Sequence, residues 1–146
     1  MKRLLFVCTG NTCRSPMAEL ILKDKFKKNQ VKGIRVSSAG LSATENHKIS
    51  KNSLHALKKM GIKGYAFRSK QLTEEMVNKA DLILTMTVSQ KESILRYFPK
   101  SKTLCVCEIT GKKEISDPYG QGLEVYEKTA SEIDDACNII LENVLI

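Results

Sequence analysis

The chain contains no tryptophan, and aromatic residues make up only 5% of it. Proteins that stack nucleic-acid bases need aromatic platforms, and no helix-turn-helix pattern is present, so we expect no nucleic-acid partner. There are only two histidines, and the five cysteines show no CxxC spacing. Only Cys105 and Cys107 lie close together. The sequence therefore predicts no metal site.

Long apolar runs are also missing. None is long enough to span a membrane, and Met1-Lys2-Arg3 leads into a short strand rather than a secretory signal. Five cysteines, an odd number, do not suggest a disulfide framework and suit a reducing compartment. We therefore expect a cytoplasmic protein that does not bind membranes. The length of 146 residues predicts one domain, residues 1–146, and the sequence does not indicate its oligomeric state.

Positive charge is concentrated in the first half of the chain. Residues 1–73 contain 16 Lys and Arg against 3 Asp and Glu, a net charge of +13, whereas residues 74–146 contain 8 against 13, a net charge of −5. A basic half would raise the local concentration of anionic substrates. For the lysines of residues 23–28, a plainer interpretation is that they solvate a helix C-terminus, where cations are favoured.

Strand-like and helix-like patterns alternate along the chain, which predicts an α/β fold. Apolar runs predict four parallel strands at 4–7, 33–38, 82–86 and 103–107, followed by a polar loop over 108–122. Helical spacing of apolar residues predicts intervening helices and a long amphipathic helix over 123–144. We also expect a short helix after Thr73 and another opened by a capping box at Ser89–Glu92. The result would be a three-layer structure with helices on both faces of the sheet.

The most informative segment is LLFVCTGNTCRSPMAEL, residues 4–20. A buried strand ends at Cys8, a short loop rich in turn residues follows, and Ser15-Pro16 can cap and open a helix. Backbone N–H groups of such a loop, together with the helix N-terminus, bind a phosphate dianion and keep a thiol ionised. Cys8 and Arg14 are therefore a candidate nucleophile and phosphate clamp. A buried cysteine in an ordinary strand-to-helix turn is the plainer alternative, and the loop lacks the residues of a Walker or dinucleotide motif.

CTGNTCRSPMAE resembles the phosphate loop of the low-molecular-weight protein phosphatase family, in which Cys, five residues and then Arg-Ser follow one another. The resemblance covers essentially the whole chain, because the segments 36–40, 67–73, 80–87 and 117–120 look like that family's landmarks in the same order. It implies the strand order 2-1-3-4 and an enzyme that removes phosphate from proteins without a cofactor. The implied phosphate-binding residues are Thr9, Gly10, Asn11, Thr12, Cys13, Arg14 and Ser15.

Within that resemblance, Cys8, Arg14 and Asp117 are the expected catalytic residues. Cys8 would form a cysteinyl-phosphate intermediate, and Arg14 would hold two phosphate oxygens. Asp117 would act as general acid and then as general base, although Asp117-Pro118-Tyr119-Gly120 by itself reads as a turn. Ser15 could cap the helix or donate a hydrogen bond to the sulfur, and the family pattern favours the second role.

Three further residues near this loop have expected roles. Asn11 would fix the loop in a left-handed conformation. Tyr119 would line the substrate opening, which looks wider than in tyrosine-directed members because Gly120 replaces their second aromatic residue. Cys13 could form a reversible disulfide with Cys8, or could be a small buried apolar residue.

Thr12 bears on the substrate. Tyrosine-directed members of the family typically have an aliphatic residue there, whereas a bacterial branch with CTGNTCRS removes phosphate from arginine. Threonine is smaller than isoleucine, and its hydroxyl offers a polar contact near a planar cationic leaving group. We therefore expect a protein-arginine phosphatase, with a tyrosine phosphatase as the alternative. Thiol-dependent arsenate reductases have a similar loop, but residues 87–98 lack the cysteines that they require. A phosphate-binding module without activity is a further alternative.

Overall fold

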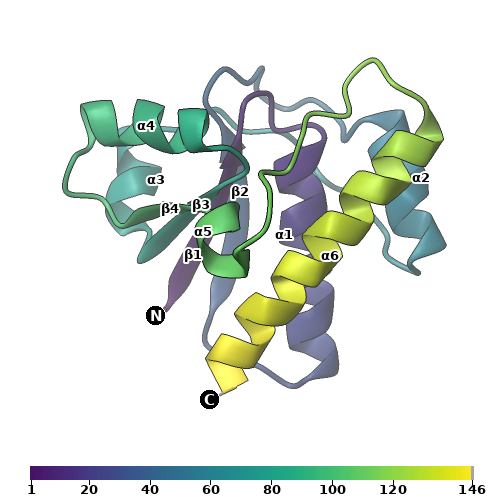
Figure 1. The fold of residues 1–146 in the computed structure, drawn as a ribbon, viewed down its shortest axis with the longest axis horizontal. Helices are drawn as coiled ribbons and strands as arrows, with labels where there is room; N and C mark the ends of the chain where they lie inside the picture. Colours follow the sequence, from purple (N-terminus) through teal and green to yellow (C-terminus); the bar gives the residue numbers. More distant parts are fainter. Residues whose placement is uncertain (146) are drawn as a thin grey trace.

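The computed structural model describes residues 1–145 and contains one parallel sheet with helices on both faces (Figure 1). Its strands lie in the order β2-β1-β3-β4. The bounds of the strands are Arg3–Cys8 for β1, Arg35–Gly40 for β2, Leu82–Thr85 for β3 and Thr103–Cys105 for β4. The helices are α1 (Arg14–Lys28), α2 (Lys51–Lys59), α3 (Glu74–Lys79), α4 (Val88–Tyr97), α5 (Val106–Thr110) and α6 (Leu123–Leu145). The α/β class and the strand order expected from the sequence are thus confirmed.

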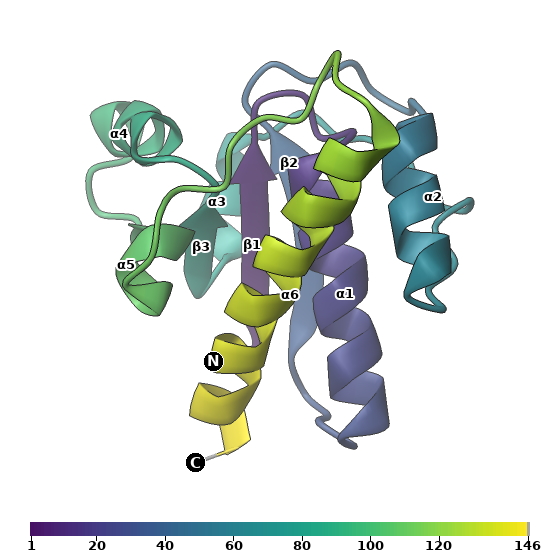
Figure 2. The ribbon, with the colours of Figure 1, turned by 45° about the vertical axis from the view of Figure 1, so that its right-hand side comes forward.

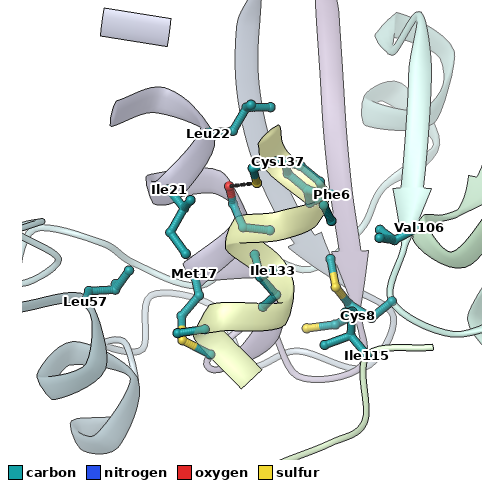
Figure 3. Packing of buried hydrophobic residues seen from close by; sticks show 14 of the residues in the cluster. Phe6, Cys8, Met17, Ile21, Leu22, Leu57, Val106, Ile115, Ile133 and Cys137 are labelled. Carbon is teal, nitrogen blue, oxygen red and sulfur yellow. Dashed lines mark hydrogen bonds between the residues drawn. The ribbon is translucent and has the colours of Figure 1, made fainter. Parts of the chain in front are cut away.

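Side chains of the central strand β1 alternate between two hydrophobic clusters, as the pleat of a strand requires. Leu4, Phe6 and Cys8 face a large cluster formed mainly with α1, α2 and α6, whereas Leu5 and Val7 face a smaller one with α3 and α4. The two views of the ribbon show α1 and α6 side by side on one face and α3 and α4 on the other (Figures 1 and 2). Figure 3 shows Phe6 of β1 close to α6 in the large cluster. Because β1 is buried on both faces, its carboxyl end is held firmly in place.

The junction after β4 differs from the expected strand over 103–107. The strand ends at Cys105, and α5 begins at once with Val106. The carboxylate of Glu108 accepts a hydrogen bond from the backbone N–H of Cys105, which closes the first turn of the helix (2.8 Å). Cys107 therefore belongs to a helix and not to the expected strand.

Two helix starts also differ from those expected. The capping box of α4 is formed by Thr87 and Gln90, not by Ser89 and Glu92, because β3 already ends at Thr85. Helix α1 begins at Arg14, with Cys13 as its N-terminal flanking residue and no side-chain cap. Ser15 is therefore inside the helix, and Pro16 is the third helical residue, where its missing N–H is still harmless.

The ends of the sheet have different surroundings. The carboxyl ends of β1 and β2 meet in the pair Cys8 and Gly40, so the loop after β1 lies at this end. A cavity of about 720 Å³ lies at the opposite end, where Leu4, Ile34 and Leu82 line it. No helix in residues 1–145 combines the length and the apolar character needed to cross a membrane.

Candidate active site

The five residues Thr9–Cys13 connect the end of β1 to the start of α1 and pass close to the end of β2. Gly40 makes this approach possible, since a Cβ there would lie 2.6 Å from the carbonyl oxygen of Thr9 and 3.0 Å from the backbone nitrogen of Asn11. Two backbone hydrogen bonds fix the loop against the segment after β2, from Leu41 N to Cys8 O and from Ser42 N to Thr9 O (2.9 Å each). These contacts hold the first part of the loop against the end of β2 and the segment that follows it.

Asn11 links this loop to two other segments. Its backbone has φ 55°, the left-handed conformation that asparagine tolerates better than most residues. Its side-chain amide donates to the hydroxyls of Ser15 (2.8 Å) and Ser38 (3.0 Å), and its carbonyl accepts from the backbone N–H of Lys70 (2.8 Å). Because Asn11 is fully buried, these bonds hold the curvature of the loop in a shielded environment.

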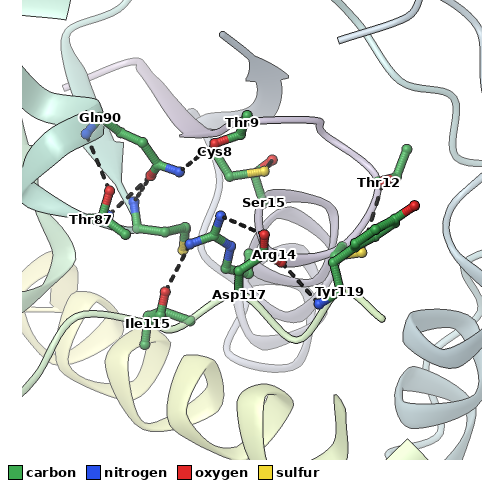
Figure 4. Close-up of polar contacts among 12 residues, drawn as sticks. Cys8, Thr9, Thr12, Arg14, Ser15, Thr87, Gln90, Ile115, Asp117 and Tyr119 are labelled. Carbon is green, nitrogen blue, oxygen red and sulfur yellow. Dashed lines mark hydrogen bonds and ion pairs between the residues drawn. The ribbon is translucent and has the colours of Figure 1, made fainter. Parts of the chain in front are cut away.

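Cys8 lies at the base of the loop, with 2% of its surface exposed. Its sulfur is 2.9 Å from the hydroxyl oxygen of Ser15. Since that oxygen already accepts a hydrogen bond from Asn11, the single proton of the hydroxyl is free to point at the sulfur. This contact, rather than a cap on α1, is where the structure places the Ser15 side chain (Figure 4).

Arg14, 5% exposed, extends from the first turn of α1 toward the segment after α5. Its Nη1 donates to the carbonyl oxygen of Ile115 (3.0 Å), and its Nη2 lies 3.7 Å from Oδ2 of Asp117. Its buried Nε has no hydrogen-bond partner within residues 1–145. A buried donor without a partner costs about 1–3 kcal/mol, so an anion held by the loop would offset a real penalty.

Asp117 and Tyr119 lie on the exposed segment between α5 and α6. The side chain of Asp117 is 55% exposed, and its Oδ1 accepts a hydrogen bond from the backbone N–H of Tyr119 (3.0 Å). Tyr119 is 78% exposed, and Figure 4 shows its ring on the same side of the loop as Thr12. Of the expected catalytic residues, Arg14 thus contacts Asp117 directly, and Cys8 contacts Ser15.

Thr12 and Cys13 face the side of the loop that is nearest to α2 and α6. The carbonyl oxygen of Thr12 accepts from the backbone N–H of Ser50 (2.9 Å). The sulfur of Cys13 lies 3.4 Å from the hydroxyl of Ser50 and 3.6 Å from that of Tyr126. Burial, and then the hydrogen bond to Cys13, raise the pKa of Tyr126 to about 12. Tyr126 therefore remains a neutral partner for Cys13 at physiological pH.

Gln90 is a contact of the loop that the sequence did not suggest. Its Oε1 accepts from the backbone N–H groups of Met86 and Thr87 (3.0 Å each), and its Nε2 donates to the hydroxyl of Thr9 (3.2 Å). Gln90 thereby ties the start of α4 to the first residue of the loop (Figure 4). The signal in the sequence is Thr87-x-x-Gln90, a capping-box pattern that begins two residues before the one expected at Ser89–Glu92.

Comparison with known proteins places this geometry in context. A family model described as low molecular weight phosphotyrosine protein phosphatase matches residues 3–145. A protein-arginine-phosphatase of Geobacillus stearothermophilus is 38% identical over 146 residues, covering 97% of this chain and 95% of that protein. The low-molecular-weight protein-tyrosine-phosphatase PtpB of Staphylococcus epidermidis is 37% identical over 139 residues, covering 91% and 92%.

The solved structures show the same likeness. The low-molecular-weight protein tyrosine phosphatase from T. tengcongensis superposes with a TM-score of 0.92 at 41% identity, covering 98% of this chain and 99% of that one. Relatives named for arginine and for tyrosine are therefore similar to the chain to nearly the same degree. Overall similarity does not decide the substrate, which has to be argued from the site.

Proposed function

Because the chain belongs to the low-molecular-weight phosphotyrosine protein phosphatase family and is a phosphoprotein phosphatase, we propose that it hydrolyses phosphoarginine in proteins through a cysteinyl-phosphate intermediate. The observation that carries the mechanism is the contact of Cys8 with Ser15 at the base of a loop that ends at Arg14. The observation that carries the substrate is threonine at position 12 of that loop.

In the first step, the Cys8 sulfur attacks phosphorus in line with the leaving group and becomes bonded to it. The attacking species is the thiolate. The hydroxyl of Ser15 stabilises the negative charge on the sulfur. The positive N-terminal end of the α1 dipole, which follows the loop Thr9–Cys13, also stabilises it. Asn11 acts through Ser15, because its amide orients the hydroxyl toward the sulfur.

Arg14 and the loop amides stabilise the charge that develops on the transferring phosphoryl group. The planar guanidinium of Arg14 can hold two of its oxygens at once, which lysine cannot do. The carbonyl of Ile115 and the carboxylate of Asp117 hold this guanidinium from the other side, so it is positioned before the substrate binds.

Asp117 supplies the proton to the leaving nitrogen as the bond to phosphorus breaks. In the second step, the same carboxylate takes a proton from the water that attacks the cysteinyl phosphate, which releases inorganic phosphate and restores the thiolate. Its exposure and its hydrogen bond from Tyr119 N keep it on the solvent side, where the leaving group departs.

Thr12 supports arginine over tyrosine as the substrate. Its side chain is partly exposed at the loop, while its carbonyl is held by Ser50 N. A hydroxyl offers the guanidinium leaving group a hydrogen-bond acceptor, whereas the phenol ring of phosphotyrosine would pack better on an aliphatic side chain. Gly120 adds no second aromatic residue after Tyr119, which leaves little for a phenol ring to stack on. A tyrosine phosphatase with the same mechanism is the alternative.

An arsenate reductase would need further cysteines that can reach Cys8. Cys105 pairs in register with Thr85, which pairs with Val7, so two strand spacings separate it from β1. Two spacings amount to about 10 Å, beyond the roughly 7 Å between Cα atoms that a disulfide can bridge. The position of Cys105 therefore favours a phosphatase.

The test is a side-by-side assay on peptides that carry phosphoarginine or phosphotyrosine, with the Cys8→Ser variant as the blank. We expect kcat/KM to be higher for phosphoarginine, and Thr12→Ile to move the ratio toward phosphotyrosine. Thr12→Val is the matched control, because it removes the hydroxyl with almost no change in size. A wild-type preference for phosphotyrosine would overturn the substrate while leaving the mechanism intact. Activity on neither peptide would overturn both.

A further inference from the structure

Cys105 and Cys107 form a pair of thiols that the phosphatase mechanism does not use. Cys105 ends β4, and Cys107 lies in the first turn of α5. Their sulfur atoms lie 2.9 Å apart, with the Cys107 thiol donating to the sulfur of Cys105. The sulfurs of a disulfide are about 2.05 Å apart. A movement of less than about 1 Å would therefore join them.

The surroundings give the two thiols different reactivity. Cys105 is fully buried, and burial followed by the hydrogen bond from Cys107 raises its pKa to about 12. Cys107 is partly exposed at the surface of α5. An oxidant from solution therefore reaches Cys107 first, and Cys105 is held in contact as its partner.

This pair is separate from the phosphate loop. Cys105 pairs with Thr85 of β3, and β3 lies between β4 and β1. The backbone N–H of Cys105 is held by Glu108, whose carboxylate also pairs with Lys91 of α4 at 2.8 Å. These contacts anchor the start of α5, so the two sulfurs remain close together independently of the site at Cys8.

We propose that Cys105 and Cys107 are a redox-active dithiol that a peroxide converts into an intramolecular disulfide. The Cys107 thiolate attacks one peroxide oxygen, the O–O bond breaks, and a sulfenic acid forms while hydroxide leaves. The Cys105 sulfur then attacks the Cys107 sulfur, the S–O bond breaks, and the Cys105 proton leaves with the departing hydroxide as water. The two sulfurs lose two electrons in total, and the peroxide is reduced to two molecules of water. An added dithiol reverses the reaction by thiol–disulfide exchange.

The positions of lysine and arginine make the test direct. Trypsin releases Cys105 and Cys107 on one peptide, residues 103–112 (TLCVCEITGK), and Cys8 and Cys13 on another, residues 4–14 (LLFVCTGNTCR). Wild-type protein is treated with increasing hydrogen peroxide, unfolded in an alkylating reagent, digested and analysed by mass spectrometry. We expect peptide 103–112 to lose both alkylatable thiols together and to lack two hydrogen atoms, and dithiothreitol to restore them.

Matched variants separate a disulfide from independent oxidation. In Cys107→Ser, Cys105 should remain alkylatable at peroxide doses that fully convert the wild-type peptide. In Cys105→Ser, Cys107 should stop at a sulfenic acid that dimedone traps. The proposal is overturned if peptide 103–112 stays doubly alkylated at doses that oxidise peptide 4–14, or if Cys107 is found bonded to a peptide other than its own. The wild-type result stands even if one of the variants does not fold.

Discussion

Two strand-to-helix junctions of the sheet, after β1 and after β4, both start from a cysteine, but the two cysteines differ in their chemistry. β1 and β4 both end with a buried cysteine at the carboxyl end of the parallel sheet, and each is followed by a helix. After Cys8, the five residues Thr9–Cys13 intervene before α1. After Cys105 there is no loop, and α5 begins with the next residue.

The length of the connection decides what the cysteine faces. At the first junction the loop Thr9–Cys13 separates Cys8 from the start of α1, and the hydroxyl of Ser15 contacts the sulfur of Cys8. At the second, the Glu108 carboxylate occupies the N-terminus of α5, and the neighbour of Cys105 is another thiol. Burial dominates there and keeps Cys105 protonated. A cysteine at the end of a parallel strand is therefore not by itself a nucleophile.

Exchanging cysteine for serine at each junction gives the largest expected contrast. Cys8→Ser should lower kcat on phosphopeptides by at least about 10⁴-fold, because serine is not ionised at neutral pH and the reaction loses its nucleophile. Cys105→Ser should retain most of the activity, since its side chain contacts no residue of the proposed mechanism. Steady-state kinetics on both purified variants, with circular dichroism to verify folding, measure the contrast. Equal losses in the two folded variants would refute this assignment of the nucleophile.

Asp117 lies on the segment that follows α5. Asp117→Asn should lower kcat by about 10²–10⁴-fold on phosphopeptides, because general acid catalysis is lost. The loss should be much smaller on an aryl phosphate whose leaving group needs no proton. Glu114→Gln, on the same segment, is the control and should not show this dependence on the leaving group. A uniform loss across substrates would assign Asp117 to holding Arg14 instead.

Ser15→Ala sharpens the comparison at the first junction. Removing a hydrogen bond to a charged sulfur should slow alkylation of Cys8 by iodoacetamide at pH 7 by about tenfold or more. Cys107, in the same molecule and partly exposed, provides the internal control, because its contacts are unchanged. Alkylation rates are read from the two tryptic peptides. Unchanged reactivity of Cys8 would mean that the Ser15 hydroxyl serves the fold alone.

The same contrast explains what the sequence could and could not predict. The first junction could be predicted because an apolar strand, a run of turn residues and the Arg14-Ser15 pair follow one another as three distinct segments of the sequence. The second junction differs from the prediction because Thr103–Cys107 is uniformly compatible with a strand, and only Glu108 marks the helix start. Contacts between distant segments, such as Gln90 with Thr9 or Tyr126 with Cys13, have no local pattern and required the fold.

The smallest expected effect comes from changing Glu108, and it is an effect on stability rather than on activity. The hydrogen bond from Lys91, and then the backbone N–H of Cys105, lower the pKa of Glu108 below its ordinary value of 4.5. A carboxylate with a lowered pKa in the folded state stabilises the protein above its ordinary pKa, and this contribution is lost as the pH falls through the lowered value. Glu108→Gln should therefore reduce Tm slightly at pH 7, and the difference from wild type should shrink progressively below pH 4.5. Lys91→Met should show the same convergence in thermal unfolding, because it removes the other half of the pair. A difference in Tm that stays constant to low pH would mean that the shape of Glu108, and not its charge, holds the start of α5.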